Sequence, residues 1–320
     1  MVSPRGASAN EDRPAGETLA SRRFVFVTGK GGTGKTTLSA ALALALAARG
    51  RRVLITSTSP RHRLSELLGV APFSTEIRDF GNNIWGVHLV PEVALHEYGA
   101  MVLRSERLVS LLFDNRYAEG LFRGAPGLRE WALLGKAWFH SVEVLADGSP
   151  RFDVVIFDGP ATGHGIDMLR VPKVILSAAP PGRLRTDAER AYASFQDPKT
   201  SAFVVVTLPE ELPTNETLEL VSHLSGELGL PVSEIVLNAA LPTLFSQDEA
   251  KGLVRAAREA GSEAVSRALV AGARRASAES VQAECVARLA ASGRPLRWLP
   301  RLLAGVNDKH AVLELSRHLG

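Results

Sequence analysis

The stretch GKGGTGKT, residues 29–36, decides how the rest of this sequence is interpreted. It matches G-x-x-x-x-G-K-[ST], the pattern of a loop that binds the phosphates of a nucleoside triphosphate. Glycines let successive backbone N–H groups of such a loop point at phosphate oxygens, beside the positive end of the helix that follows. Lys35 is expected to neutralise the β- and γ-phosphates, and the Thr36 hydroxyl to bind Mg²⁺. The alternative is a glycine-rich turn that only caps a helix.

The motif therefore predicts a site for ATP with Mg²⁺. The residues expected to hold the nucleotide are Gly29, Gly31, Gly32, Thr33, Gly34, Lys35, Thr36 and Thr37.

The residues on either side of the loop have the pattern of one βαβ unit. Residues 24–27 (FVFV) form a short apolar run, typical of a parallel strand that is covered on both faces. A helix is predicted from about Lys35 to just before Gly50, and a second strand at 53–55. Further strands are expected at 84–90, 154–157, 203–207, 235–237 and 296–299. The predicted fold is α/β: a P-loop NTPase with a mostly parallel sheet flanked by helices.

Several helices are predicted outside this unit. Pro213, Thr214 and Glu216 are expected to open one helix, with Thr214 as its N-cap, and residues 308–319 to form another. Two longer stretches, at about 95–145 and 247–291, are helical in pattern and predict an added helical layer. We expect a single domain over 23–320, preceded by a flexible tail at 1–22.

The composition limits the classes of function. Of the 320 residues 45% are apolar, which allows a sizeable core and excludes general disorder. The 37 basic and 34 acidic residues are scattered and give a net charge of +3, so nothing indicates a nucleic-acid partner. Residues 1–22 lack the apolar segment of a signal peptide, and the Leu/Ala run at 38–48 is too short to cross a bilayer. We therefore expect a soluble, cytoplasmic protein.

A carboxylate, Asp158, ends the strand predicted at 154–157, where it would hold Mg²⁺ through water opposite a phosphate loop. The segment DGPATGH at 158–164 resembles the D-T-A-P-T-G-H switch of the arsenical pump-driving and tail-anchored-protein-targeting ATPases. The sequence K-G-G-x-G-K-T-T from Lys30 is similar to the deviant Walker A loop of the same branch. Shorter matches occur at 126–130 and 209–217. The resemblance covers the chain from about Phe24 to its C-terminus.

The resemblance implies a two-fold dimer with nucleotides at its interface. In the family, the lysine that matches Lys30 reaches the partner's nucleotide; taken alone, Lys30 could be a surface charge. Asn238 matches the asparagine that reads the adenine edge, and Pro300 falls where a C-terminal loop covers the base. His164 is either part of the switch or an ordinary loop histidine.

The resemblance also implies partners. Family members work with a membrane protein or a hydrophobic cargo, which would bring this protein to the membrane only through a partner. Apolar residues of the first helical stretch, such as Met101, Leu108 and Phe113, could line a cargo groove, although core packing is the favoured explanation. The dimer could be a homodimer or a heterodimer with a paralogue.

This sequence departs from the family at the switch after its second strand. The family reads D-P-A-H there, and its Asp positions the attacking water; here Ser59 occupies the Asp position. A hydroxyl is a poor general base. Replacement of the carboxylate by Ser59 is therefore expected to lower the rate of ATP hydrolysis by about 10²–10⁴-fold. Three explanations remain. The chain hydrolyses ATP slowly, or another residue such as His62 takes over the role of the Asp, or the chain mainly binds nucleotide and pairs with an active paralogue. We favour the last slightly.

A second departure concerns cysteine. Targeting members have a C-x-x-C pair for a dimer-bridging zinc, whereas Cys285 is the single cysteine of this chain. We therefore predict no zinc, no iron–sulfur cluster and no thiol site for arsenite.

Two functions from different classes follow. One is a Mg-dependent ATPase that acts on a membrane partner or cargo, with Lys30, Lys35, Ser59 and Asp158 in its catalytic centre. The other is a nucleotide-sensing subunit that hydrolyses little. A DNA-partition ATPase is disfavoured because T-G-H is the wrong switch for that class.

Overall fold

The computed structural model describes residues 19–59, 62–103, 127–259 and 261–319. Strands from these ranges form one eight-stranded sheet in the order β3-β4-β2-β5-β1-β6-β7-β8. All neighbouring strands are parallel except β3 and β4. The strands are β1 (Phe24–Gly29), β2 (Val53–Ser57), β3 (Arg78–Asp79), β4 (Ile84–His88), β5 (Val154–Asp158), β6 (Ser201–Thr207), β7 (Val232–Ala240) and β8 (Leu296–Pro300). The predicted α/β fold with a mostly parallel sheet is confirmed.

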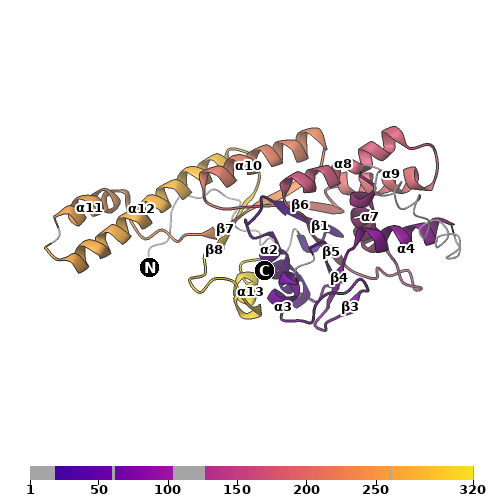
Figure 1. Cartoon of the computed structure of the whole chain (residues 1–320), viewed down its shortest axis with the longest axis horizontal. Coiled ribbons are helices and arrows are strands. Elements are labelled where there is room, and N and C mark those ends of the chain that lie inside the picture. Colours follow the sequence, from indigo (N-terminus) through magenta and orange to yellow (C-terminus); the bar gives the residue numbers. More distant parts are fainter. Residues whose placement is uncertain (1–18, 60–61, 104–126, 260, 320) are drawn as a thin grey trace.

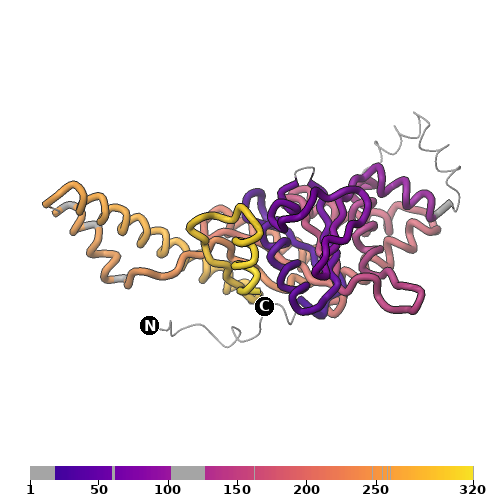
Figure 2. The backbone as a smooth tube through the Cα atoms, turned by 90° about the horizontal axis from the view of Figure 1, so that it is seen from below, coloured from indigo at the N-terminus to yellow at the C-terminus, as the bar shows by residue number. Residues whose placement is uncertain are grey.

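Helices cover both faces of this sheet (Figure 1). One face carries α2 (Lys35–Ala48), α3 (Arg63–Leu68) and α13 (Lys309–Ser316). The opposite face carries α7 (Leu128–Val142), α8 (Thr162–Ala178), α9 (Arg183–Gln196) and α10 (Glu211–Ser222), which continues into a π-helical turn at His223–Glu227. Helix α4 (Pro91–Leu103) packs beside α7. Figure 2 shows α11 (Gln247–Arg258) and α12 (Glu263–Ala290) extending together from the other end of the molecule.

Strand β1 lies at the centre of the sheet because its residues are apolar on both faces. Phe24 and Phe26 face the cluster under α7 to α10, where the ring of Phe26 stacks on that of Phe157 with centroids 5.0 Å apart. Val25 and Val27 face α2 on the other side. All six residues of β1 are buried, as the continuous apolar run predicts for a parallel strand.

Most predicted elements are present. All seven predicted strands occur, and the helix after the loop ends at Ala48, before Gly50. Asp308 caps α13, since its carboxylate accepts a hydrogen bond from the Ala311 N–H at 3.0 Å. The short strand β3 was missed because its two exposed residues give no apolar signal. Helices occur in both of the longer stretches predicted as helical, although residues 104–126 lie outside the described ranges, as do residues 1–18 of the predicted tail.

The predicted start of α10 was wrong. The helix begins at Glu211 with Glu210 at the N-cap, and no side chain caps it. Thr214 is buried inside the helix, and its hydroxyl has no hydrogen-bond partner among the described residues. The error arose at Pro213: proline is tolerated anywhere in a first turn, because none of the N–H groups there has an intrahelical acceptor.

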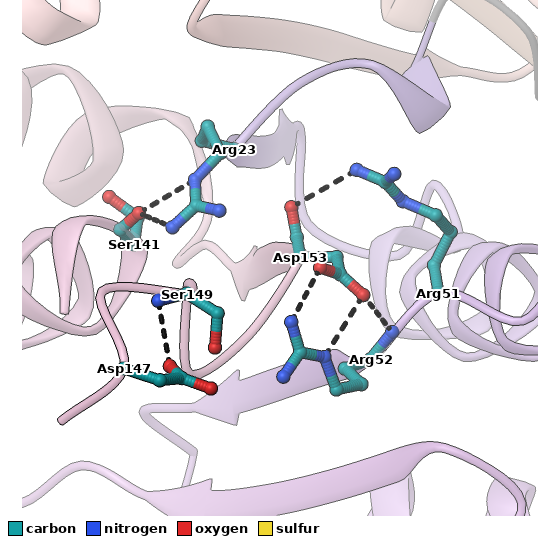
Figure 3. Close-up of polar contacts among 7 residues, drawn as sticks. All are labelled: Arg23, Arg51, Arg52, Ser141, Asp147, Ser149 and Asp153. Carbon is teal, nitrogen blue, oxygen red and sulfur yellow. Dashed lines mark hydrogen bonds and ion pairs between the residues drawn. The ribbon is translucent and has the colours of Figure 1, made fainter. Parts of the chain in front are cut away.

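A charged cluster joins the amino-terminal ends of the central strands, opposite the loop (Figure 3). Asp153, just before β5, accepts from the Arg52 guanidinium at 3.0 and 3.2 Å and from the Arg52 N–H at 2.8 Å. Arg23, just before β1, donates to the Ser141 carbonyl at 2.6 and 3.0 Å. Burial alone would raise the pKa of the Asp153 carboxyl, but the hydrogen bonds from Arg52 bring that pKa below its ordinary value. The cluster therefore fixes β1, β2 and β5 against α7.

Within the described ranges, every helix is too short or too polar to span a bilayer.

Candidate nucleotide-binding site

The predicted phosphate loop joins β1 to α2 at the carboxyl edge of the sheet, where open α/β sheets bind their ligands. Gly29 has a φ of 143°, and a Cβ added there would lie 2.3 Å from the Val206 carbonyl oxygen of β6. Gly34, the N-cap of α2, has a φ of 98°, and an added Cβ would lie 2.0 Å from Nδ2 of Asn238. Both positions combine a left-handed backbone with a close neighbour, so the loop requires glycine at each.

The side chains of the loop hydrogen-bond to its own backbone. The Lys35 ammonium and the Thr33 hydroxyl both donate to the Lys30 carbonyl, each at 2.9 Å. Burial lowers the pKa of Lys35, and the nearby Asp158 carboxylate opposes that shift. Gly31 and Gly32 are exposed, whereas Thr36 and Thr37 are half-buried in the first turn of α2.

Asp158 lies beside this loop, as the sequence predicts. Its Oδ2 accepts from the Thr36 hydroxyl at 2.9 Å, and its Oδ1 accepts from the Ser39 hydroxyl at 3.0 Å. Burial raises the pKa of Asp158 to about 6, although both hydroxyls and the Lys35 charge act to lower it. Ser39 was not predicted. Its position three residues after Thr36 puts both hydroxyls on one face of α2, which is the signal that could have identified it.

Lys30 is bound within its own chain. Its ammonium forms an ion pair with the Glu216 carboxylate of α10, which sequence reasoning did not connect with the loop. The Lys30 side chain is 49% exposed and that of Glu216 is 22% exposed, so the pair lies at the surface.

Asn238 also reaches the loop. Its Nδ2 donates to the Thr33 carbonyl at 2.8 Å, from the carboxyl-terminal part of β7. Pro300 ends the neighbouring strand β8 and pairs with Ala240, two residues beyond Asn238. The two residues assigned to adenine binding therefore lie at the carboxyl-terminal ends of adjacent strands, at the same edge of the sheet as the loop.

Ser59 follows β2 and lines a small cavity together with His62 and His88. The Ser59 N–H donates to the Ser57 hydroxyl at 3.2 Å. Nδ1 of His88 lies 3.1 Å from the Ser57 carbonyl oxygen, which fixes the imidazole at the end of β4. The sequence indicated His62 but missed His88, because a lone histidine at the end of a strand carries no motif.

The segment that resembles a switch passes directly into a helix. Helix α8 begins at Thr162, and His164 is exposed in its first turn. Cys285 is buried in α12. The described part of the chain holds no group of three or more His, Cys, Asp or Glu residues arranged to bind a metal ion.

Comparisons with known proteins agree with this arrangement. The family model described as "Anion-transporting ATPase" matches residues 22–179, which include the loop, Ser59 and Asp158. ATPase BagA of Mycobacterium tuberculosis is 33% identical over 242 residues, which cover 73% of this chain and 70% of BagA. ATPase GET3 of Kluyveromyces lactis is 28% identical over 259 residues, 70% of this chain and 74% of that protein. ATPase ARSA1 of Chlamydomonas reinhardtii is 27% identical over 311 residues, 77% of this chain and 39% of that protein. The chain belongs to the anion-transporting ATPase family and is an ATPase.

Proposed function

We propose that this chain binds Mg–ATP in the loop at 29–36 and acts as a dimer that couples its nucleotide state to a membrane partner or a cargo. The observation that carries the proposal is the buried Asp158 carboxylate, held by the hydroxyls of Thr36 and Ser39 directly beside the loop. A carboxylate in this place provides the charge that a divalent cation needs, and Lys35 provides the opposite charge for the phosphates.

The donor set fits Mg²⁺. A hydroxyl and a carboxylate are hard oxygen ligands, and Mg²⁺ usually takes only one or two of these from the protein and keeps several waters. The Thr36 hydroxyl would bind the ion directly, and Asp158 would hold one of its waters. When bound, Mg²⁺ neutralises the charge that develops on the β- and γ-phosphates. With Cys285 as the only cysteine of the chain, we propose neither zinc nor an iron–sulfur cluster.

The dimer follows from the resemblance of the loop to its deviant form. Lys30 would contact the nucleotide of a second subunit, while Asn238 and Pro300 would lie against the adenine. The exposed position of the Lys30 side chain supports a role outside its own subunit. The segments after Thr58 and Asp158 would transmit the phosphate state to the helical layer. ATP would favour the closed dimer over the open one only to the extent that it binds the closed dimer more tightly. A homodimer and a heterodimer with a paralogue are both consistent with this arrangement.

Ser59 is the reason for a second candidate function, a nucleotide-binding subunit that hydrolyses slowly beside an active paralogue. The small cavity places two imidazoles near Ser59, those of His62 and His88, and either is a stronger base than a hydroxyl. Phosphate release by purified protein, compared with Ser59→Asp, separates the two functions. A rise of about 10²-fold or more would identify the missing carboxylate as the cause of slow hydrolysis. No change would show that hydrolysis does not depend on this position.

A cavity of about 480 Å³ supports a hydrophobic cargo as the partner. It lies between α4, α7 and α9, and its lining includes Trp131, Trp138, Phe139 and Met101. Of the groove residues suggested by the sequence, Met101 is described and lies here. A labelled apolar helical peptide should bind the full chain in the presence of ATPγS. Phe139→Glu, at a side chain that is 40% exposed, should abolish that binding without unfolding the protein.

The binding step itself is tested by calorimetry. Mg–ATPγS should bind the wild-type chain, and Lys35→Ala should weaken binding by about 10²-fold or more, since the charge-assisted contact of the ammonium with the phosphates is lost. Equal binding by both proteins would refute the proposed site.

A further inference from the structure

The Lys30 side chain is held by a carboxylate from a distant part of its own chain. Glu216 lies 186 residues after Lys30, on α10, and forms an ion pair with the lysine ammonium. The backbone of Lys30 is fixed as well, because its carbonyl accepts hydrogen bonds from Lys35 and Thr33. The cation that the proposed dimer needs at its interface is therefore already paired in the single chain.

We propose that Glu216 is a positioning residue: it holds Lys30 on its own subunit, and this contact must break before Lys30 can reach the nucleotide of a second copy of the chain. The inference rests on the dimer of the proposed function and adds to it. A carboxylate is a natural competitor for a phosphate, because both are oxygen anions that accept hydrogen bonds from an ammonium group.

Glu216 is well placed to stay still while Lys30 moves. It lies inside α10, and α10 packs against both β6 and α12. The preceding residue, Asn215, accepts a hydrogen bond from Arg288 of α12, which anchors this turn from a second side. Lys30, by contrast, extends from an exposed part of the loop on a long flexible side chain. The ammonium is therefore the member of the pair that leaves.

The size of the effect follows from exposure. The side chains of Lys30 and Glu216 are 49% and 22% exposed, so water screens this ion pair in part. Double-mutant cycles on exposed ion pairs give contributions equivalent to about 1.5- to 5-fold in an equilibrium constant. Each dimer breaks two such pairs, one in each subunit, so removing the Glu216 charge should tighten the nucleotide-loaded dimer by the square of this factor, about 2- to 25-fold. Because exposed charges are screened by salt, the effect should shrink as ionic strength rises.

The test compares Glu216→Gln with a matched control on the same helix. Glu219 is exposed on α10, so Glu219→Gln removes the same charge without touching Lys30. Dimer dissociation constants of the full chain in Mg–ATPγS are measured by sedimentation equilibrium at about 0.05 M and 0.5 M salt. Calorimetry on dilute protein gives the nucleotide affinity of the single subunit, and thermal melts establish that each variant is folded.

The expected result is a dimer of Glu216→Gln that is about 2- to 25-fold tighter at low salt, with little difference at high salt. Glu219→Gln should match the wild type, Glu216→Asp should fall between, and the nucleotide affinity of the single subunit should not change. A Glu216→Gln dimer of unchanged or weaker affinity would overturn the proposal, since Glu216 would then be irrelevant or act in the closed state. If the wild type binds nucleotide but does not dimerise, the proposed dimer fails, and the role of Glu216 fails with it.

Discussion

Replacement of Gly34 by alanine tests the geometry of the phosphate loop most directly. Two costs can be worked out from the structure. The left-handed backbone, with φ at 98°, costs alanine about 1–2 kcal/mol. The new Cβ would also lie 2.0 Å from Nδ2 of Asn238, so that side chain must move and give up its hydrogen bond to the Thr33 carbonyl, which costs a further ~1 kcal/mol. The expected total is about 2–3 kcal/mol.

This cost must appear in one of two measurements. If the loop keeps its shape, urea unfolding shows a loss of stability; if the loop gives way, calorimetry shows weaker binding of Mg–ATPγS. The sum of both losses should reach about 2–3 kcal/mol, equivalent to roughly 30- to 150-fold in nucleotide affinity if all of it falls on binding. Gly252→Ala, in α11, is the matched control, because an added Cβ there meets nothing within 4 Å.

The clash with Asn238 is tested separately in an Asn238→Ala background. With the amide removed, Gly34→Ala should cost only the backbone strain, about 1–2 kcal/mol. The interaction between the two substitutions should therefore be about 1 kcal/mol. Equal costs in both backgrounds would refute the steric argument, and no cost in either would refute the loop geometry itself.

Three further predictions follow from particular contacts. Asp153→Asn should lower the free energy of unfolding in urea by about 2 kcal/mol, because charge-assisted hydrogen bonds to Arg52 are weakened. Asp147→Asn should lower it less, because that carboxylate is exposed and accepts from Ser149, which an amide oxygen can also do. Since the folded pKa of Asp153 lies below its unfolded value, this stability is present above about pH 4 and lost as the pH falls through the folded pKa, so the gap between wild type and Asp153→Asn should close in acid. EDTA should weaken ATPγS binding by about 10-fold or more in the wild type and by clearly less in Asp158→Asn; an EDTA effect of wild-type size would contradict the proposed role of Asp158 in holding Mg²⁺.

The sequence predicted this fold well because the decisive signals are local. Short apolar runs such as 24–27 and 154–157 are typical of buried parallel strands, and the loop motif predicts the strand before it and the helix after it. Contacts between segments that are distant in the chain could not be predicted from the sequence. Nothing in the sequence near Thr33 indicates that the amide of Asn238 will occupy the space above Gly34, and nothing near Lys30 indicates Glu216. Those contacts depend on how α10 and β7 pack, which no local pattern encodes.

Strand register explains why the site could be predicted in outline but not in detail. In the parallel sheet Val27 and Ser57 both pair with Asp158, and Ser57 also pairs with His88, so the segments after β1, β2, β4 and β5 emerge side by side. A polar residue at the carboxyl end of a central strand therefore lies close to the loop, which agrees with the assignment of Asp158 from the strand that it ends and from the resemblance of the segment at 158–164. The same geometry brings His88 toward Ser59, the position at which the resemblance predicts a carboxylate. An imidazole held through Nδ1 by a backbone carbonyl presents Nε2 as a base. If Ser59 stands in place of a catalytic carboxylate, as proposed, the imidazole of His88 at the end of β4 is a candidate base that the segment at 57–62 does not itself contain.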